Sequence, residues 1–183
     1  MPVQKITKEE IITICTKVFW TNGYYNSSLE DLSKASGLSK ALFYHHFQSK
    51  ENLMIEAIKQ SHDYFKENVF TIFYKNTTKQ KKINELIIVC EKVFCQNMNG
   101  CFMGNTILET SRNSPQFKPY INAFFADWIR GFEQLFEDEP IAAIRTDLAE
   151  QCIIEIEGAL IMMRLKENKK YLVNTLRKIK ERI

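Results

Sequence analysis

A chain of 183 residues is long enough to bury a core of its own, and its 45% hydrophobic and 26% charged residues exclude a disordered or fibrous protein. Only six glycines and four prolines are present, too few for the frequent turns of a β-sandwich or β-barrel, so helices are favoured. The net charge of +3 does not by itself indicate a nucleic-acid binder, which needs a local basic face.

The chain carries no signal for secretion, for membrane insertion or for a cysteine-based site. Its apolar stretches are shorter than the roughly 20 residues that span a bilayer, and the amino terminus has no apolar run. Five cysteines form no CxxC pair, which argues against a disulfide framework or a zinc ribbon. We therefore expect a soluble cytoplasmic protein with no cofactor and no membrane partner.

Helix start and stop signals are clear in the first third of the chain. Thr7 begins a capping-box pattern, and Asn22-Gly23 ends the first helix, which is predicted over residues 8–22. A short second helix starts after Ser28, and Ser39 caps a third over residues 40–47. Two short helices joined by a tight turn that contains glycine form a helix-turn-helix.

Later signals complete a fold of about nine helices. The expected ranges are Lys50 to about Tyr74 after a Ser49 cap, 79–98, 103–112, Ser114 to about Glu137 with Pro115 at the first helical position, 147–166 after a Thr146 cap, and 171–182. These ranges predict an all-α protein. A three-helix unit with its helix-turn-helix over 28–47 would occupy residues 5–65, and a larger helical bundle would occupy 66–183.

The third helix contains FYHHF, which could be a metal site, a piece of core or a contact surface. Each residue of a helix advances about 100°, so Phe43 and Phe47 share an apolar side, whereas His45 and His46 point apart. Metal ligands must converge, commonly from histidines at i and i+4, so no metal site is predicted.

The opposite side of this helix is polar, cationic and aromatic, as the DNA major groove requires. Lys40 can bind guanine edges or phosphates, and Ala41 allows close approach to a base. Hydroxyls and an ammonium at helix starts can bind phosphates. A solvated face on a structural hairpin is the alternative. The DNA-binding candidates are Ser28, Ser39, Lys40, Ala41, Leu42, Tyr44, His45 and Lys50.

The stretch SLEDLSKASGLSKALFYHHFQSKENL resembles the amino-terminal DNA-binding domain of the TetR family of transcriptional regulators. In that family a pattern close to T-x-x-x-I-A-x-x-A-G-V-S-x-x-x-x-Y-x-H-F-x-x-K precedes a long fourth helix, and the resemblance covers about residues 5 to 65. Ser33 departs from the usual alanine without an expected effect on packing. Leu42 replaces a residue that is often small or polar, which would alter base preference.

The remaining chain, with GCFMGNTILE and a proline-started aromatic helix, resembles more weakly one branch of the family's ligand-binding and dimerisation domains. Aromatic and methionine stripes at helical spacing are often core, but together they predict an apolar pocket with a few polar anchors. The pocket candidates are Tyr64, Phe65, Phe94, Cys101, Phe102, Met103, Asn105, Glu109, Phe124, Trp128, Glu155 and Met162.

Cys101 is also a candidate sensor, because helix amides could stabilise its thiolate and make it reactive; a half-buried unreactive thiol is the alternative. The resemblance implies a homodimer held by the helices near 147–166 and 170–182. Gly158-Ala159 would allow close helix approach, and the last helix would offer a second apolar stripe that needs a cover.

Together these features predict a homodimeric regulator, by family resemblance a repressor, that binds a palindromic operator in double-stranded DNA and is released by a small apolar or reactive molecule. An enzyme is the first rival, but the chain offers no Ser-His-acid set, metal spacing or phosphate-binding glycine loop. A structural helical adaptor is the second.

Overall fold

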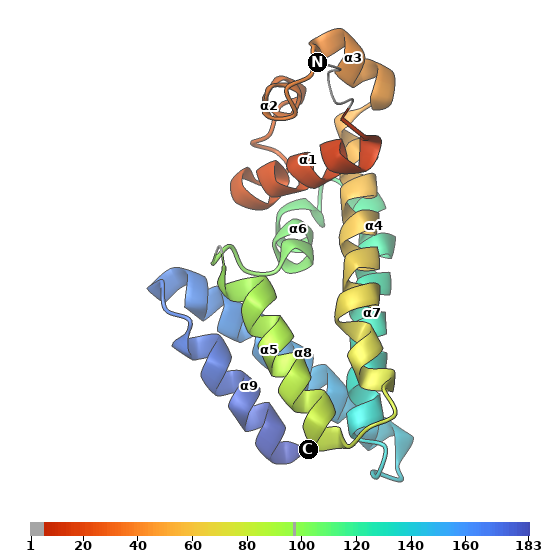
Figure 1. The fold of residues 1–183 in the computed structure, drawn as a ribbon, viewed down its shortest axis with the longest axis vertical. Helices are drawn as coiled ribbons and strands as arrows, with labels where there is room; N and C mark the ends of the chain where they lie inside the picture. Colours follow the sequence, from red (N-terminus) through yellow and green to blue (C-terminus); the bar gives the residue numbers. More distant parts are fainter. Residues whose placement is uncertain (1–5, 97) are drawn as a thin grey trace, which may run out of the picture. The chain divides into compact units, whose positions relative to one another are not determined.

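The computed structural model describes residues 6–96 and 98–183, and within these ranges it contains α-helices and short 3₁₀-helices but no strand (Figure 1). The all-α prediction is confirmed. The elements are α1 (Lys8–Asn22), α2 (Leu29–Ala35), α3 (Lys40–His46), α4 (Lys50–Asn68), η1 (Phe70–Tyr74), α5 (Lys79–Cys95), α6 (Phe102–Thr110), η2 (Pro115–Phe117), α7 (Lys118–Leu135), α8 (Ala142–Lys166) and α9 (Lys170–Arg182). In the described ranges, no helix is both long and apolar enough to cross a membrane.

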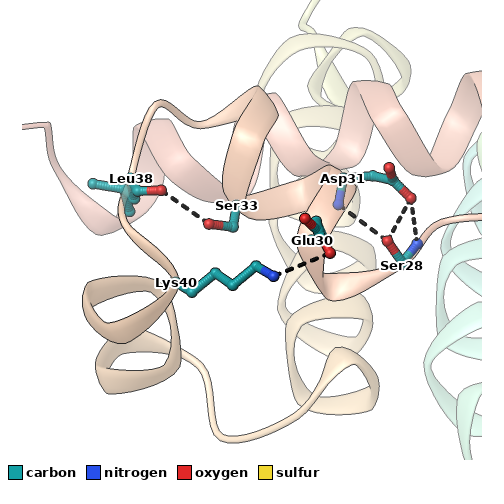
Figure 2. A network of polar contacts seen from close by, with 6 residues as sticks. All are labelled: Ser28, Glu30, Asp31, Ser33, Leu38 and Lys40. Carbon is teal, nitrogen blue, oxygen red and sulfur yellow. Dashed lines mark hydrogen bonds and ion pairs between the residues drawn. The ribbon is translucent and has the colours of Figure 1, made fainter.

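The first helices begin where their capping residues predict. The Thr7 hydroxyl accepts the Glu10 amide at 3.1 Å while the Glu10 carboxylate accepts the Thr7 amide at 2.8 Å, which satisfies two amides at the start of α1. Ser28 and Asp31 form the same reciprocal pair at the start of α2 (Figure 2). Ser39 caps α3 by accepting the Leu42 amide.

Three later elements differ from the predicted ranges. The helix that starts at Lys50 ends at Asn68, because the β-branched and aromatic run VFTIFY instead forms η1 and buries Phe70, Ile72 and Phe73. Pro115 opens the 3₁₀-helix η2 and not α7 itself.

Helix α8 also starts earlier than predicted, at Ala142. Thr146 is not its cap, because the Thr146 hydroxyl donates to Glu133 Oε1 at 2.5 Å from within the helix.

The chain forms two compact units. Unit 1 comprises Met1–Asp63 together with Asn105–Ile121, and unit 2 comprises Tyr64–Gly104 together with Asn122–Ile183. The boundaries fall inside α4, α6 and α7, so each of these helices contributes residues to both units. The segment 105–121 therefore belongs with the helix-turn-helix, an association that local sequence patterns do not reveal.

Unit 2 holds an aromatic core and a covered carboxy-terminal helix. The α9 stripe of Leu172, Leu176 and Ile179 is fully buried, and α9 packs along α8 and α5 of the same chain (Figure 1). The cover that this stripe was predicted to need comes from α5 and α8 of the same chain.

Gly131 gives a test of the packing in unit 2. Replacing a helical glycine by alanine ordinarily stabilises a protein by up to about 1 kcal/mol. A Cβ at Gly131 would overlap the Phe73 ring, so we expect Gly131→Ala to lower the free energy of unfolding by about 1–3 kcal/mol in chemical denaturation. The loss should shrink in a Phe73→Leu background; a stabilising Gly131→Ala would contradict this packing.

Candidate nucleic-acid interface and effector unit

Helix α3 has one buried and one exposed side. Phe43 and Phe47 lie in the core with ring centroids 5.3 Å apart. On the other side Lys40, Ala41 and His45 are exposed, and Tyr44 is 51% exposed. Leu42, at the edge of this side, is exposed as well. The predicted division of FYHHF by face is confirmed at the level of burial.

A short hydrogen-bond network sets the turn between α2 and α3. The turn residue Gly37 has a φ of +70°, which favours glycine. The buried Ser33 hydroxyl donates to the Leu38 carbonyl at 2.9 Å, and the Leu38 amide donates to the Ser33 carbonyl at 3.2 Å (Figure 2). Ser33 thus adds a bond across the turn that an alanine could not make.

The exposed side carries an ion pair that sequence reasoning missed. Lys40 Nζ lies 3.0 Å from Glu30 Oε2, and both side chains are largely exposed (Figure 2). Such a pair contributes little to stability because water and salt screen it. Its consequence is local: a phosphate or base that binds the Lys40 ammonium must compete with the Glu30 carboxylate.

The serines and lysine at the helix starts make contacts within the protein. Ser28 Oγ donates to Asp31 Oδ2 at 2.6 Å, and hydrogen bonds from Ser28 lower the pKa of Asp31. Ser28 and Ser39 remain exposed. Lys50 Nζ donates to the Tyr24 carbonyl at 2.9 Å and lies over the Tyr24 ring. Desolvation lowers the pKa of Lys50, whereas the charge of Glu109 opposes this shift. A phosphate contact by Lys50 stays a prediction.

Some predicted pocket residues come together in unit 2. The Trp128 ring stacks on Phe94 with centroids 6.1 Å apart and contacts Phe124 edge-on at 5.6 Å. Phe65 contacts all three of these rings, and Phe70, which was not predicted, joins them from η1. Among the described residues no partner accepts the buried Trp128 indole N–H. This aromatic cluster is core with one unsatisfied donor.

Other pocket candidates have different surroundings. The Glu155 carboxylate is bound by both terminal nitrogens of Arg182, at 2.8 and 2.6 Å. Tyr64 is exposed, whereas Met162 is half-buried. Glu109 belongs to unit 1, where its carboxylate accepts two backbone amides. Asn105 also belongs to unit 1, whereas the residues of the aromatic cluster belong to unit 2.

Cys101 is buried at the start of α6, next to Phe102 and Met103, which are buried too. The Gly104 amide donates to its sulfur at 3.4 Å, as expected for a thiol at a helix start. Burial nevertheless raises the pKa of Cys101 well above its ordinary value, and the nearby charge of Glu157 raises it further. Burial and the charge of Glu157 therefore both disfavour the reactive thiolate in this conformation.

Glu157 is the acidic neighbour that sequence reasoning missed. Burial raises the pKa of Glu157 to about 7, and its Oε1 atom has no hydrogen-bond partner among the described residues. Its spacing from Ile153 and Leu160, which are both buried, places it on the inward side of α8. The sequence signal for Glu157 is its helical spacing from the apolar residues Ile153 and Leu160, which places an acid on an apolar side of the helix.

Comparisons with known proteins identify both parts of the chain. The family model described as bacterial regulatory proteins, tetR family, matches residues 11–57, and the one described as transcriptional regulator LmrA/YxaF-like, C-terminal domain, matches residues 80–178. The HTH-type transcriptional repressor DhaR of Mycobacterium sp. (strain GP1) is 25% identical over 175 residues, which cover 88% of this chain and 84% of DhaR.

Solved structures share the fold. A TetR transcriptional regulator from Legionella pneumophila superposes with a TM-score of 0.88 at 22% identity and covers 100% of both chains. A cysteine mutant of CifR, a TetR family transcriptional regulator complexed with 26bp double-strand operator DNA, gives a TM-score of 0.82 at 18% identity and covers 98% of each chain.

The raised pKa of Glu157 predicts a pH dependence of stability. Between its ordinary value of 4.5 and about 7, the folded chain keeps a proton that the unfolded chain has released. The contribution of Glu157 to the free energy of unfolding therefore falls as the pH rises through this window and changes no further above it. Glu157→Gln cannot titrate, so we expect a melting temperature near that of the wild type at about pH 5 and higher by several degrees at about pH 8.

The matched control is Glu67→Gln, which removes an exposed carboxylate from α4. A difference between Glu157→Gln and wild type that does not change with pH in thermal unfolding would contradict the half-buried, proton-binding state of Glu157.

Proposed function

Because the chain belongs to the TetR family of bacterial regulatory proteins and is a helix-turn-helix transcriptional regulator, we propose that it represses transcription by binding a palindromic operator as a homodimer. The observation that carries this proposal is α3, whose aromatic residues are buried on one side while a cationic and aromatic side stays exposed. DhaR, a relative along most of the chain, is named a repressor, and CifR was solved with operator DNA.

The exposed side of α3 supplies both kinds of DNA contact. Lys40 can reach a guanine edge or a phosphate, and Ala41 leaves room for the helix to approach the bases. Tyr44 and His45 can donate to phosphate oxygens, while Leu42 adds an apolar contact. Ser28 and Ser39 are exposed at helix starts. The Ser39 hydroxyl accepts a backbone amide and can still donate to a phosphate, whereas the Ser28 hydroxyl must first release Asp31 Oδ2.

The dimer is proposed to form through α8, with α9 beside it. Ile154, Gly158, Ile161 and Leu165 are exposed and follow one another at spacings of four, three and four residues, so they lie along one side of α8. A Cβ at Gly158 would meet no atom within 4 Å, which leaves space for a second helix. Since the apolar stripe of α9 is covered within the chain, α9 would contribute its exposed polar side.

Two-fold symmetry would double the phosphate contacts of one protomer. Each protomer offers only a few cations near α3, and a dimer places two reading helices on half-sites roughly 34 to 36 Å apart, one turn of DNA. A salt-dependent affinity follows, because each neutralised phosphate releases counterions.

Release is proposed to follow binding of a small apolar or reactive molecule in unit 2. The support is the aromatic cluster with its unsatisfied Trp128 N–H, which suits an apolar ligand that carries one hydrogen-bond acceptor. Such a ligand shifts the protein only if it prefers the conformation that cannot bind DNA. Cys101 could react with an electrophile or oxidant only after a change that exposes it and lowers its pKa. We place the regulator in the cytoplasm, where bacterial operators are.

The DNA face is tested by single substitutions with a salt-controlled gel-shift assay. We expect Lys40→Ala and Tyr44→Ala each to weaken binding to a selected operator by at least about tenfold, since a dimer loses the contact twice. Lys40→Ala should also reduce the slope of log affinity against log salt by about 2, if each Lys40 neutralises one phosphate. Tyr44→Ala should leave this slope unchanged.

The opposite arm of the same test is Glu30→Gln, which frees the Lys40 ammonium and should tighten binding. Lys92→Ala, which removes an exposed cation from α5, is the control and should change nothing. Unchanged affinity of the α3 variants would rule out this face as the DNA contact.

Two isoleucines that are both 68% exposed test the dimer. Ile154 lies on the α8 stripe and Ile88 on α5. We expect Ile154→Glu to bury a charge at the interface and give monomers with reduced operator affinity in analytical ultracentrifugation and gel-shift assays, whereas Ile88→Glu stays dimeric. The interface would have to lie elsewhere if Ile154→Glu dimerised like the wild type.

A further inference from the structure

The turn between α1 and α2 is bound by a carboxylate from a distant helix. Glu109, on α6, accepts the Tyr24 amide with Oε2 at 2.8 Å and the Tyr25 amide with Oε1 at 2.8 Å. Both oxygens of one carboxylate thus bind two consecutive backbone amides, and hydrogen bonds to an ionised acceptor are among the stronger ones. The three residues belong to unit 1, so this contact lies within one compact body.

Gly23 makes this contact possible. Its φ of +87° favours glycine, and a Cβ there would lie 2.9 Å from each oxygen of the Glu109 carboxylate. The residue that ends α1 is therefore constrained twice, once by its backbone conformation and once by the approach of Glu109. A carboxylate fixed in this way holds the turn in one conformation.

The same turn is bound on other sides. Lys50, the first residue of α4, donates to the Tyr24 carbonyl, and the Tyr24 ring packs edge-on against Phe117 with centroids 5.0 Å apart. The Tyr25 hydroxyl lies 2.9 Å from Ser114 Oγ. Tyr24 and Tyr25 are thus held by contacts with the segment 105–121 and with the first residue of α4.

We propose that Glu109 is a positioning residue for operator binding. The turn at Tyr24 and Tyr25 leads into α2, and Lys50 begins α4 shortly after α3 ends, so the contacts of this turn fix how the helix-turn-helix is oriented on α6. Helix α6 starts in unit 2, at Phe102–Gly104, and carries Glu109 in unit 1. Glu109 thereby binds the turn between α1 and α2 from a helix whose first residues belong to unit 2.

This role predicts an effect on half-site spacing. A dimer whose reading helices are held in one orientation binds best to half-sites at one separation. Loosening the hold on the turn should let α3 reach half-sites at other separations, while the bases and phosphates that α3 contacts stay the same. The inference rests on the dimeric, palindromic operator proposed above.

The test measures affinity for a series of duplexes in which single base pairs are added or removed between the half-sites of a selected operator. Glu109→Gln keeps one carbonyl acceptor but turns an N–H group toward the second amide, so it loses one of the two bonds. We expect about tenfold weaker binding at the preferred spacing and a much smaller loss at the others. The affinities at different spacings should therefore differ less than in the wild type. Glu67→Gln, which removes an equal charge from an exposed site, should keep the wild-type profile.

Tyr25→Phe provides a second, milder variant that removes only the hydroxyl contact with Ser114. It should also reduce the difference in affinity between the preferred spacing and the others. An equal loss at every spacing for both variants would indicate mere destabilisation and overturn the positioning role, as would an unchanged profile. If the wild type binds a single half-site as tightly as a pair, the dimeric operator itself is contradicted; a wild-type preference that Glu109→Gln leaves intact contradicts only the role of Glu109.

Discussion

The burial of Phe43 and Phe47 is the constraint on which the DNA-binding function depends. Because these two rings occupy the core of unit 1, the helix that carries them can present only its other side to solvent. That side holds a lysine, a tyrosine and a histidine, groups that donate to phosphates and base edges. The adjacent histidines differ in burial, because His45 is exposed and His46 is half-buried. Their rings nevertheless meet edge-on with centroids 5.9 Å apart, so the expectation that they point apart is wrong. Packing in the core therefore selects the residues available to DNA.

Three polar side chains hold the turns and the lysine of the helix-turn-helix region in place. Ser33 ties the turn before α3, Glu30 holds the Lys40 ammonium, and Glu109 binds the turn after α1. The first two are local to the helix-turn-helix, whereas Glu109 reaches it from α6. In unit 2 the start of α6 lies beside Cys101 and the half-buried Glu157, whose carboxylate approaches Gly104.

Local signals predicted most of the fold and the exposed side of α3, because caps, glycine stops and helical periodicity act within a few residues. Thr7, Ser28 and Ser39 cap helices as their spacing indicates. Predictions were wrong where tertiary packing decides. The run VFTIFY leaves the helix predicted from Lys50 and buries Phe70, Ile72 and Phe73, and the cover of the α9 stripe comes from α5 and α8. The role of Glu109 could not be predicted because its partners lie 84 and 85 residues away, and a lone acid gives no sign of them.

The most direct test of the central claim is hydroxyl-radical footprinting of the full-length protein with and without a selected operator. Tyr44 on α3 and Tyr74 at the end of η1 are 51% and 58% exposed, so both should be oxidised readily in the free protein. If the exposed side of α3 enters the DNA groove, the operator should protect Tyr44 and the neighbouring Leu42 while Tyr74 reacts as before. Oxidation of Tyr44 that the operator leaves unchanged would contradict this account of how the protein binds DNA.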